Sequence, residues 1–314
     1  MMTDVRTRWG DKPYYSLDYY LREQFGEKVY RLSLNAGLTC PNRDGTLGNR
    51  GCIFCSGHGS GDFAAAPAGS VTRQIEAARI QVAKKRNCRK FIAYFQAYTN
   101  TYGPLPYLKK IFFEAIRHPD IVALSIATRP DCLPDEVLDL LTELARIKPV
   151  WIELGLQTIH PRTSSFIRSG FSLECYETSV HRLQERHIPV ITHVILGLPG
   201  ETKQDMLETI DYLAGLGING ITLQLLHILT DTDLYTYYQE HPFPLLSLED
   251  YCELIMTCIE HLPPDMVIHR ITGDGPSELL FAPLWSLRKR HVLNQIHKTM
   301  QEHNSYQGKQ FLSE

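Results

Sequence analysis

The stretch RLSLNAGLTCPNRDGTLGNRGCIFC, residues 31–55, leads from a short strand-like run into a loop that holds three of the chain's eight cysteines. The run RLSLNA (31–36) predicts a first β-strand. The loop after it consists largely of turn-forming residues, and its C-x-x-C pair, Cys52 and Cys55, can turn both sulfurs toward one metal. Glycines in and after the loop allow the chain to fold tightly around such a site.

Strand-like and helix-like segments alternate after this loop. Short runs rich in β-branched or aromatic residues predict strands at 90–98, 121–128, 150–158, 190–196 and 221–228. Apolar residues three and four apart predict helices near 70–87, 105–117, 134–146, 173–187 and 202–216. Six strands separated by five helices predict an α/β fold with a parallel sheet, either open or closed into a barrel. Both arrangements bind ligands at the carboxyl ends of the strands, so we expect the chemistry in the loops that follow them.

The region after about residue 230 has a different pattern. It predicts a helix at 246–262, a strand at 266–272 and a closing helix at 285–301. We therefore expect an N-terminal segment (1–28), a core (29–230) that contains the cysteine loop (40–55), and a C-terminal α/β extension (231–314).

Composition and length indicate a globular body that needs no cross-links. The chain has 314 residues, of which 43% are hydrophobic, enough for a buried core. The first thirty residues contain no apolar run and nowhere do eighteen apolar residues follow one another, so we expect a cytoplasmic protein without a membrane segment. Thiols stay reduced in that compartment, which favours metal binding over disulfides for a cysteine cluster.

The formal net charge of -3 gives the chain no overall attraction to nucleic acid. Positive charge is nevertheless concentrated at 84–90 and at 288–290. Such runs are usually solvated helix faces, and in an RNA-binding protein they contact phosphates.

Two kinds of metal site fit the cysteine loop. In one, His58 completes a tetrahedral zinc site with the three thiolates. In the other, Cys40, Cys52 and Cys55 hold three irons of a [4Fe–4S] cluster and leave the fourth iron open to a small molecule. The loop follows the first strand at the face where such folds act, and this position favours the cluster. The other five cysteines are scattered and are expected to be structural thiols.

Motifs along the strands give a resemblance to a known family. They are ATRPDCL (127–133), ELGLQT (153–158), FIRSG (166–170) and HVILGLPGET (193–202), with YFQAYTNTYGP (94–104) and RITGDGPSELLFAPLWS (270–286). Together with the cysteine loop they resemble the radical S-adenosylmethionine superfamily, its branch related to the Elongator catalytic subunit, and within it the YtqA/YhcC group. The eleven residues between Cys40 and Cys52 depart from the C-x3-C-x2-C spacing that is usual in the superfamily.

The resemblance implies a partial (β/α)6 TIM-type barrel with a C-terminal α/β extension. It implies that Cys40, Cys52 and Cys55 bind a [4Fe–4S] cluster, that S-adenosylmethionine chelates its open iron, and that reductive cleavage releases a 5′-deoxyadenosyl radical. Contacts to S-adenosylmethionine would come from Phe54, Gln96, Ala97, Tyr98, Thr99, Gln157, Arg168, His193, Gly197, Leu198 and Pro199. Where the family often has a glycine run, this chain has Gln96 to Thr99, and His193 stands where a related enzyme has an acidic residue. Phe54, Gln157 and Arg168 are also compatible with ordinary structural roles.

The resemblance further implies that the substrate is the wobble uridine of tRNA. The reaction would convert 5-carboxymethylaminomethyluridine (often 2-thiolated) toward 5-aminomethyluridine. A reduced flavodoxin- or ferredoxin-type protein would donate the electron, and a separate tRNA methyltransferase would act on the product. On this hypothesis Phe95, Tyr98 and Tyr102 stack an unpaired base. Asp274 is a candidate general acid or base, or a contact for the substrate amine, and is also a common turn residue before glycine. The alternatives are a radical enzyme with a substrate other than RNA and a non-catalytic zinc protein that binds RNA.

Overall fold

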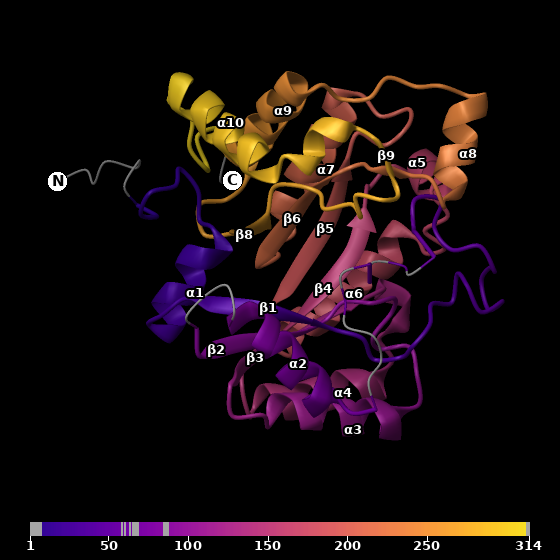
Figure 1. Ribbon diagram of the computed structural model, residues 1–314, viewed down its shortest axis with the longest axis vertical. Coiled ribbons are helices and arrows are strands. Elements are labelled where there is room, and N and C mark those ends of the chain that lie inside the picture. Colours follow the sequence, from indigo (N-terminus) through magenta and orange to yellow (C-terminus); the bar gives the residue numbers. More distant parts are fainter. Residues whose placement is uncertain are drawn as a thin grey trace. The chain divides into compact units, whose positions relative to one another are not determined.

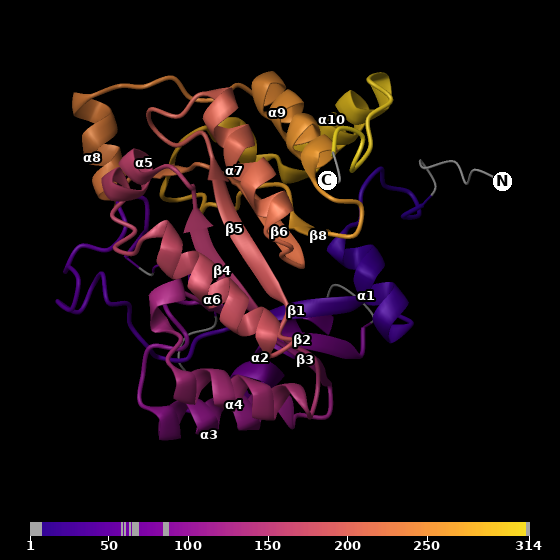
Figure 2. The same ribbon diagram turned by 180° about the vertical axis from the view of Figure 1, so that it is seen from behind.

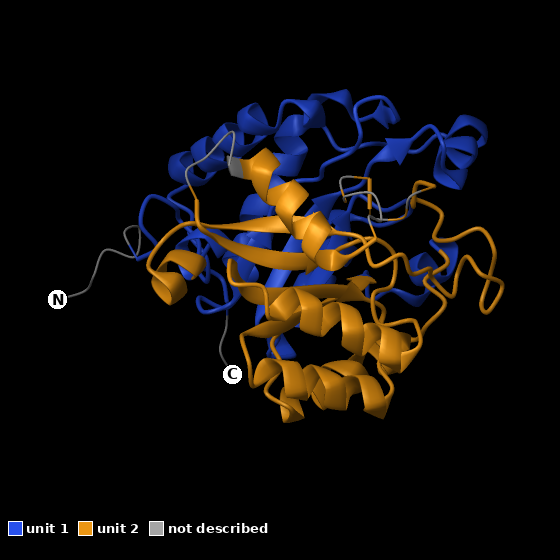
Figure 3. Ribbon diagram, turned by 60° about the horizontal axis from the view of Figure 1, so that its bottom comes forward, with its two compact units in different colours: residues 1–20, 157–167, 192–314 blue, residues 21–156, 168–191 orange. Residues whose placement is uncertain are grey.

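The computed structural model describes residues 8–57, 59, 61–62, 64, 69–83 and 88–311. The chain forms two compact units, which Figure 3 colours separately. Unit 1 contains residues 1–20, 157–167 and 192–314, and unit 2 contains residues 21–156 and 168–191. The boundary near residue 230 that the sequence suggested remains a prediction.

Parallel strands form the centre of the fold, as the alternating pattern predicted. The strands are β1 (Val29–Leu34), β2 (Lys90–Phe95), β3 (Ile121–Thr128), β4 (Val150–Gln157), β5 (Val190–Leu196), β6 (Gly220–Leu225), β7 (Ile228–Leu229), β8 (Val267–Arg270) and β9 (Leu280–Ala282). Seven of them follow the order β1-β2-β3-β4-β5-β6-β8, and β7 pairs with β9. Within unit 2, β1 to β4 pair in parallel, and within unit 1 β6 and β8 do so. Parallel pairing needs crossover helices, and these lie between the strands along the chain.

Seven of the described helices follow predicted segments, whereas those at 17–25, 161–166 and 233–240 were not predicted. The described helices are α1 (Leu17–Phe25), α2 (Val71–Ala83), α3 (Leu105–Ile116), α4 (Asp135–Ala145), α5 (Pro161–Phe166), α6 (Leu173–Glu185), α7 (Lys203–Gly215), α8 (Asp233–Glu240), α9 (Leu248–His261) and α10 (Lys289–Glu302), with short 3-10 turns η2 (Pro130–Cys132) and η3 (Leu284–Leu287). Thr202 and Asp205 form a reciprocal capping box at the start of α7. None of the described helices combines the length and the apolar character needed to cross a membrane.

Apolar residues of the strands and of the inner helix faces form the core of each unit. In unit 2, α3 packs beside both α2 and α4, as Figures 1 and 2 show from opposite sides. Strand β3 is buried along most of its length, as expected for a parallel strand covered on both faces. In unit 1, α9 packs against both α7 and α10. The cores hold the strand ends, and therefore the loops that follow them, in fixed positions.

Several element boundaries differ from the sequence prediction. Strand β2 ends at Phe95 because the chain leaves the extended region shortly afterwards, at Tyr98 with a φ of 59°. The predicted strand at 221–228 is divided into β6 and the separate β7, which pairs antiparallel with β9. The closing helix begins at Lys289, because residues 284–287 form a 3-10 turn.

Candidate functional site

Backbone hydrogen bonds shape the cysteine loop. The amide of Arg43 donates to the carbonyl of Cys40 at 2.8 Å, and the amide of Cys55 donates to that of Cys52 at 3.1 Å. The amide of Gly51 donates to the carbonyl of Asn42 at 2.7 Å. Gly51 has a φ of 76°, a left-handed conformation that glycine adopts without steric cost. The loop therefore has a defined shape that places all three cysteines.

Asn42 ties this loop to the segment 168–170. Its Nδ2 donates to the carbonyl oxygen of Arg168 at 2.7 Å and lies 3.5 Å from the Sγ of Cys52. Asn42 is only 5% exposed, so these bonds are shielded from water. Gly170 leaves room for the contact, since a Cβ there would lie 2.9 Å from the Asn42 Oδ1.

The environment of Cys52 favours its thiolate form. A hydrogen bond from Cys55 lowers the pKa of Cys52 to about 6, and the guanidinium groups of Arg129 and Arg168 and the amide of Asn42 act in the same direction. The same hydrogen bond, together with burial, raises the pKa of Cys55. Thiolates, not thiols, bind metals, so this environment suits Cys52 as a metal ligand.

One ligand of the zinc alternative cannot be placed. His58, the fourth ligand of that site, lies outside the described residues, whereas Cys40, Cys52 and Cys55 are all described.

The loop after β2 lies against the cysteine loop. The amide of Thr99 donates to the carbonyl of Thr39, the neighbour of Cys40, at 3.2 Å. The hydroxyl of Tyr98 donates to the carbonyl of Gly57 at 2.9 Å, and its ring packs so closely on Gly59 that a Cβ there would lie 2.8 Å from the ring. The structure thus brings the Gln96–Thr99 segment, Arg168 and the three cysteines together in unit 2, where Phe54 is half-buried.

The other predicted site residues belong to unit 1. His193 of β5 is hydrogen-bonded through Nδ1 to the side-chain amide of Gln224 at 3.0 Å. Gly197 has a φ of 89° and donates its amide to the sulfur of Met206 at 3.1 Å. A cavity of about 510 Å³ is lined by Gly197, Leu198, Pro199, Gly200, Glu201, Thr202, Lys203, Met206, Phe243, Pro244, Leu245, Leu246, Asp250, Glu253 and Leu254. Asp274 pairs with Arg270 and Lys289.

Three of the predicted contacts have strained backbones. Tyr98, Gln157 and Arg168 have φ values of 59°, 74° and 60°, and only two other described non-glycine residues have positive φ. Such conformations cost free energy and cluster at functional sites. The buried Oε1 of Gln157 also has no hydrogen-bond partner among the described residues. Both observations support a binding role for these positions.

Some residues near the thiols were not assigned from the sequence. Arg129 is 8% exposed, forms two hydrogen bonds to Asp131 at 2.9 and 2.8 Å, and lies over the ring of Phe171. The T-R-P-D motif was the available signal for Arg129, whereas nothing local indicated Asn42.

One residue of unit 1 was also not assigned from the sequence. Burial raises the pKa of Glu201, which accepts a hydrogen bond from Thr158 at 2.6 Å.

The expected aromatic stacking group is wrong in one member. Phe95, the last residue of β2, is completely buried and packs against Phe112, so it cannot stack a base. The hydroxyl of Tyr102 is hydrogen-bonded to Thr46 of the cysteine loop at 2.9 Å. In the basic run 84–90, Lys90 pairs with Glu27, and residues 84–87 lie outside the described part of the chain.

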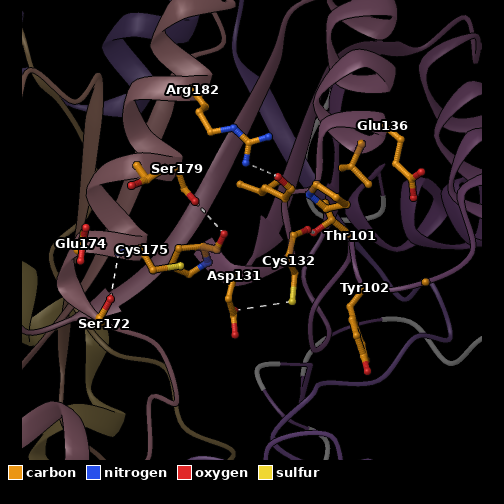
Figure 4. Close-up of a pocket in the computed structure, with 16 residues that line it drawn as sticks. Thr101, Tyr102, Asp131, Cys132, Glu136, Ser172, Glu174, Cys175, Ser179 and Arg182 are labelled. Atoms are coloured by element: carbon orange, nitrogen blue, oxygen red, sulfur yellow. Dashed lines mark hydrogen bonds between the residues drawn. The ribbon is translucent and has the colours of Figure 1, made fainter.

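A cavity of about 840 Å³ lies in unit 2 beside the T-R-P-D motif (Figure 4). Its walls come from the loops after β2 and β3, the start of α4, and α6 from its N-cap Ser172 to Arg182 in its last turn. Burial, with a contribution from Asp131, raises the pKa of both cysteines in its wall, Cys132 and Cys175. These thiols are therefore neutral at physiological pH, as expected for structural cysteines.

Comparison with known proteins gives matches over nearly the whole chain. The family profile of the Radical SAM superfamily matches residues 45–213, and that of the Radical_SAM C-terminal domain matches residues 218–302. The uncharacterized protein YtqA of Bacillus subtilis is 44% identical over 96% of this chain and 94% of its own length. Protein YhcC of Escherichia coli is 35% identical over 90% of this chain and 91% of its own length.

Two more distant matches come from methanogens. The solved structure of archaeal Methanocaldococcus infernus Elp3, with an N-terminal deletion, matches 89% of this chain and 64% of that chain with a TM-score of 0.67 at 16% identity. This match confirms the fold class, a partial TIM-type barrel. A tRNA uridine(34) acetyltransferase of Methanocaldococcus jannaschii is 23% identical over 58% of this chain and 33% of its own length.

Proposed function

Because this chain belongs to the radical S-adenosylmethionine superfamily, we propose that it acts on the wobble uridine of tRNA. The proposed reaction converts 5-carboxymethylaminomethyluridine, with or without a 2-thio group, toward 5-aminomethyluridine. The methylene next to the amine loses a hydrogen atom and then one electron, with S-adenosylmethionine as the net two-electron oxidant. Water then hydrolyses the resulting imine to the amine and glyoxylate. Enzymes of this superfamily bind a [4Fe–4S] cluster and S-adenosylmethionine. When bound, these cofactors supply a 5′-deoxyadenosyl radical that removes a hydrogen atom from the substrate.

One observation carries the proposed cluster: a single loop holds three cysteines, and the guanidinium groups of Arg129 and Arg168 favour the thiolate of Cys52. Cys40, Cys52 and Cys55 would hold the cluster, and Arg129 and Arg168 would balance its negative charge. Asn42 would keep the loop fixed against the Arg168 backbone. Soft thiolate ligands suit iron–sulfur clusters, and nearby cations and hydrogen bonds to sulfur tune them.

The remaining predicted residues would bind S-adenosylmethionine. Arg168 would pair with its carboxylate, since a guanidinium group matches the geometry of a carboxylate. Gln157, whose amide oxygen has no partner among the described residues, would accept a hydrogen bond from the ribose. The remaining contacts would come from Phe54, the segment 96–99, His193, Gly197, Leu198 and Pro199.

The tRNA substrate is supported by relatives and by surface charge. The distant M. jannaschii relative is named for uridine 34 of tRNA. In the basic run 288–290, Arg288 and Arg290 are exposed, an arrangement that suits contacts to RNA phosphates. We expect a reduced flavodoxin- or ferredoxin-type protein to deliver the electron, and a tRNA methyltransferase to act on the product.

The proposed cluster is tested by anaerobic reconstitution with iron and sulfide, followed by dithionite and S-adenosylmethionine. We expect a brown protein that forms 5′-deoxyadenosine, and a Cys52→Ala variant that forms none. Cys88→Ala is the matched control, since Cys88 lies outside the loop, and it should retain activity. A colourless protein that binds one zinc would overturn the proposal.

A further inference from the structure

A second group of charged residues lies in unit 1, at the carboxyl ends of two parallel strands. Strand β6 ends at Leu225 and its neighbour β8 ends at Arg270. His227 and the turn Gly273-Asp274-Gly275 therefore follow at the same edge of the sheet, where α/β folds bind their ligands.

Asp274 lies between two cations. Its carboxylate accepts hydrogen bonds from the Nζ of Lys289 at 2.9 and 2.8 Å, and it pairs with Arg270 at 2.5 Å. The side chains of Arg270, Asp274 and Lys289 are 28%, 35% and 46% exposed, so a ligand can reach all three. Two cations on one carboxylate leave an excess of positive charge.

The turn is built around the imidazole of His227. A Cβ on Gly273 would lie 2.6 Å from its Cε1, and a Cβ on Gly275 would lie 3.0 Å from its Nδ1. Gly273 is therefore needed for this close approach, and a side chain at Gly275 would be tightly packed. Burial, together with the charge of Arg270, lowers the pKa of His227 to about 4, so its ring is neutral at physiological pH.

Two polar atoms of the group lack partners. The Nε2 of His227 and the Nε of Arg270 are buried, and neither has a hydrogen-bond partner among the described residues. An unpaired buried polar atom is costly, and such atoms in a partly exposed charged group point to a ligand that completes the bonding. A ligand oxygen is needed for Arg270, because a guanidinium group only donates.

Further positive charge surrounds the group. The first turn of α10 carries Lys289 and Arg290, directly after the exposed Arg288, and contains no acidic residue. Acidic side chains stabilise the N-terminal end of a helix, and basic side chains do not. Lys289 and Arg290 therefore do not stabilise α10. Their charge attracts an anion.

We propose that His227, Arg270, Asp274 and Lys289 form a subsite for the carboxymethylamino group of the modified uridine, an inference that rests on the proposed function. Arg270 and Lys289 bind its carboxylate. Asp274 accepts a hydrogen bond from the protonated amine, and His227 bonds to the ligand through Nε2. The matched arrangement of positive and negative groups recognises a ligand that carries both charges a few bonds apart.

An RNA phosphate also offers anionic oxygens to Arg270 and Lys289. The test therefore distinguishes the carboxylate of the modified uridine from an RNA phosphate. Binding of the reconstituted protein is measured at fixed salt with anticodon stem-loops that carry 5-carboxymethylaminomethyluridine, 5-aminomethyluridine or uridine. We expect wild type to prefer the first RNA. Lys289→Gln and Arg270→Lys should reduce that preference by about tenfold, because each weakens charge-assisted bonds to the carboxylate.

Arg290→Gln is the matched control, because it removes the same charge next to the subsite. It should weaken binding of all three RNAs equally and leave the preference intact. Equal losses for all three RNAs in Lys289→Gln would identify a phosphate contact and overturn the subsite. Thermal melting of each variant checks that it is folded, and the exposed Lys289 provides a variant that does not disturb the core.

The binding experiment distinguishes a wrong subsite from a wrong substrate assignment. If wild type prefers the carboxymethylaminomethyl RNA and both variants keep the preference, the subsite is wrong and the substrate assignment stands. If wild type binds the three RNAs alike, the substrate assignment fails and the subsite fails with it.

Discussion

The side-chain amide of Asn42 connects the cysteine loop to a distant part of the chain by donating to the carbonyl oxygen of Arg168 at 2.7 Å. The same nitrogen lies 3.5 Å from the sulfur of Cys52. One buried amide therefore positions a predicted cluster ligand and the backbone of a predicted S-adenosylmethionine contact together.

Replacing Asn42 with alanine should weaken cluster binding. The change removes a hydrogen bond near the Cys52 sulfur and frees the Arg168 backbone, and loss of such an outer contact typically lowers metal affinity or activity by about 10- to 100-fold. Iron content and 5′-deoxyadenosine yield measure the effect. Asn49→Ala, an exposed change in the same loop, should leave both unchanged. Full iron loading and activity in Asn42→Ala would contradict the assigned role.

Replacing Gly170 with alanine should be more damaging than replacing Gly45. Both glycines have positive φ, 78° and 92°, so both substitutions carry the backbone cost of about 1 kcal/mol. A Cβ at Gly170 would also meet the Asn42 Oδ1, whereas one at Gly45 would meet nothing within 4 Å. Urea denaturation should show the greater loss for Gly170→Ala, accompanied by lower iron content. Equal losses would mean that the Asn42 contact contributes little.

Glu153 should contribute strongly to stability. It is 1% exposed, accepts a hydrogen bond from Ser125 and pairs with Arg31 at 3.0 Å. Glu153→Gln removes the negative charge that pairs with Arg31, and breaking a buried pair costs about 3–5 kcal/mol. Urea denaturation gives the change in unfolding free energy.

The exposed pair of Lys109 and Glu143 supplies a control within the same unit. Glu143→Gln should cost less than about 1 kcal/mol, because water screens an exposed pair. A similar cost for the two substitutions would show that burial does not strengthen the Glu153 pair.

His227 should make stability depend on pH. Its folded pKa is lowered from 6.5 to about 4, by burial and by Arg270, while Asp274 opposes the shift. Below pH 6.5 His227 is protonated in the unfolded chain but stays neutral in the folded chain. Stability should therefore fall as the pH drops from 6.5 toward 4. The shift corresponds to at most about 3 kcal/mol.

The unfolding free energy of wild type and His227→Gln, measured between pH 4 and pH 7, tests this dependence. The variant should lose less stability on acidification than wild type does. His181→Gln changes an exposed histidine and should keep the wild-type slope. Parallel curves for wild type and His227→Gln would show that His227 does not titrate in this range.

Local patterns predicted most elements of the fold, because burial of one face of a strand or helix gives its apolar residues a regular spacing in the sequence. Strand β3 has the predicted bounds, 121–128, and the helix predicted at 105–117 differs by one residue. The short β7 was missed as a separate strand because its two residues carry no periodicity, and its pairing with β9 depends on a segment fifty residues away. Such long-range pairing is invisible in a window of sequence.

The sequence indicates candidate site residues where a motif spans adjacent residues, as in the C-x-x-C pair. It does not indicate candidate residues that come together from distant segments. Asn42 reaches Arg168 across more than a hundred residues, and His227 gains its environment from the 273–275 turn. Phe95 was wrongly placed among the stacking residues because a strand end and a loop look alike in sequence. The strained backbones of Tyr98, Gln157 and Arg168 likewise required coordinates.

The most direct test of the central claim is nucleoside mass spectrometry of tRNA that carries 5-carboxymethylaminomethyluridine. The tRNA is incubated anaerobically with reconstituted protein, reductant and S-adenosylmethionine. The account predicts loss of that nucleoside and gain of 5-aminomethyluridine together with 5′-deoxyadenosine, and none of these changes with Cys52→Ala. Formation of 5′-deoxyadenosine while the tRNA stays unchanged would contradict the proposed substrate.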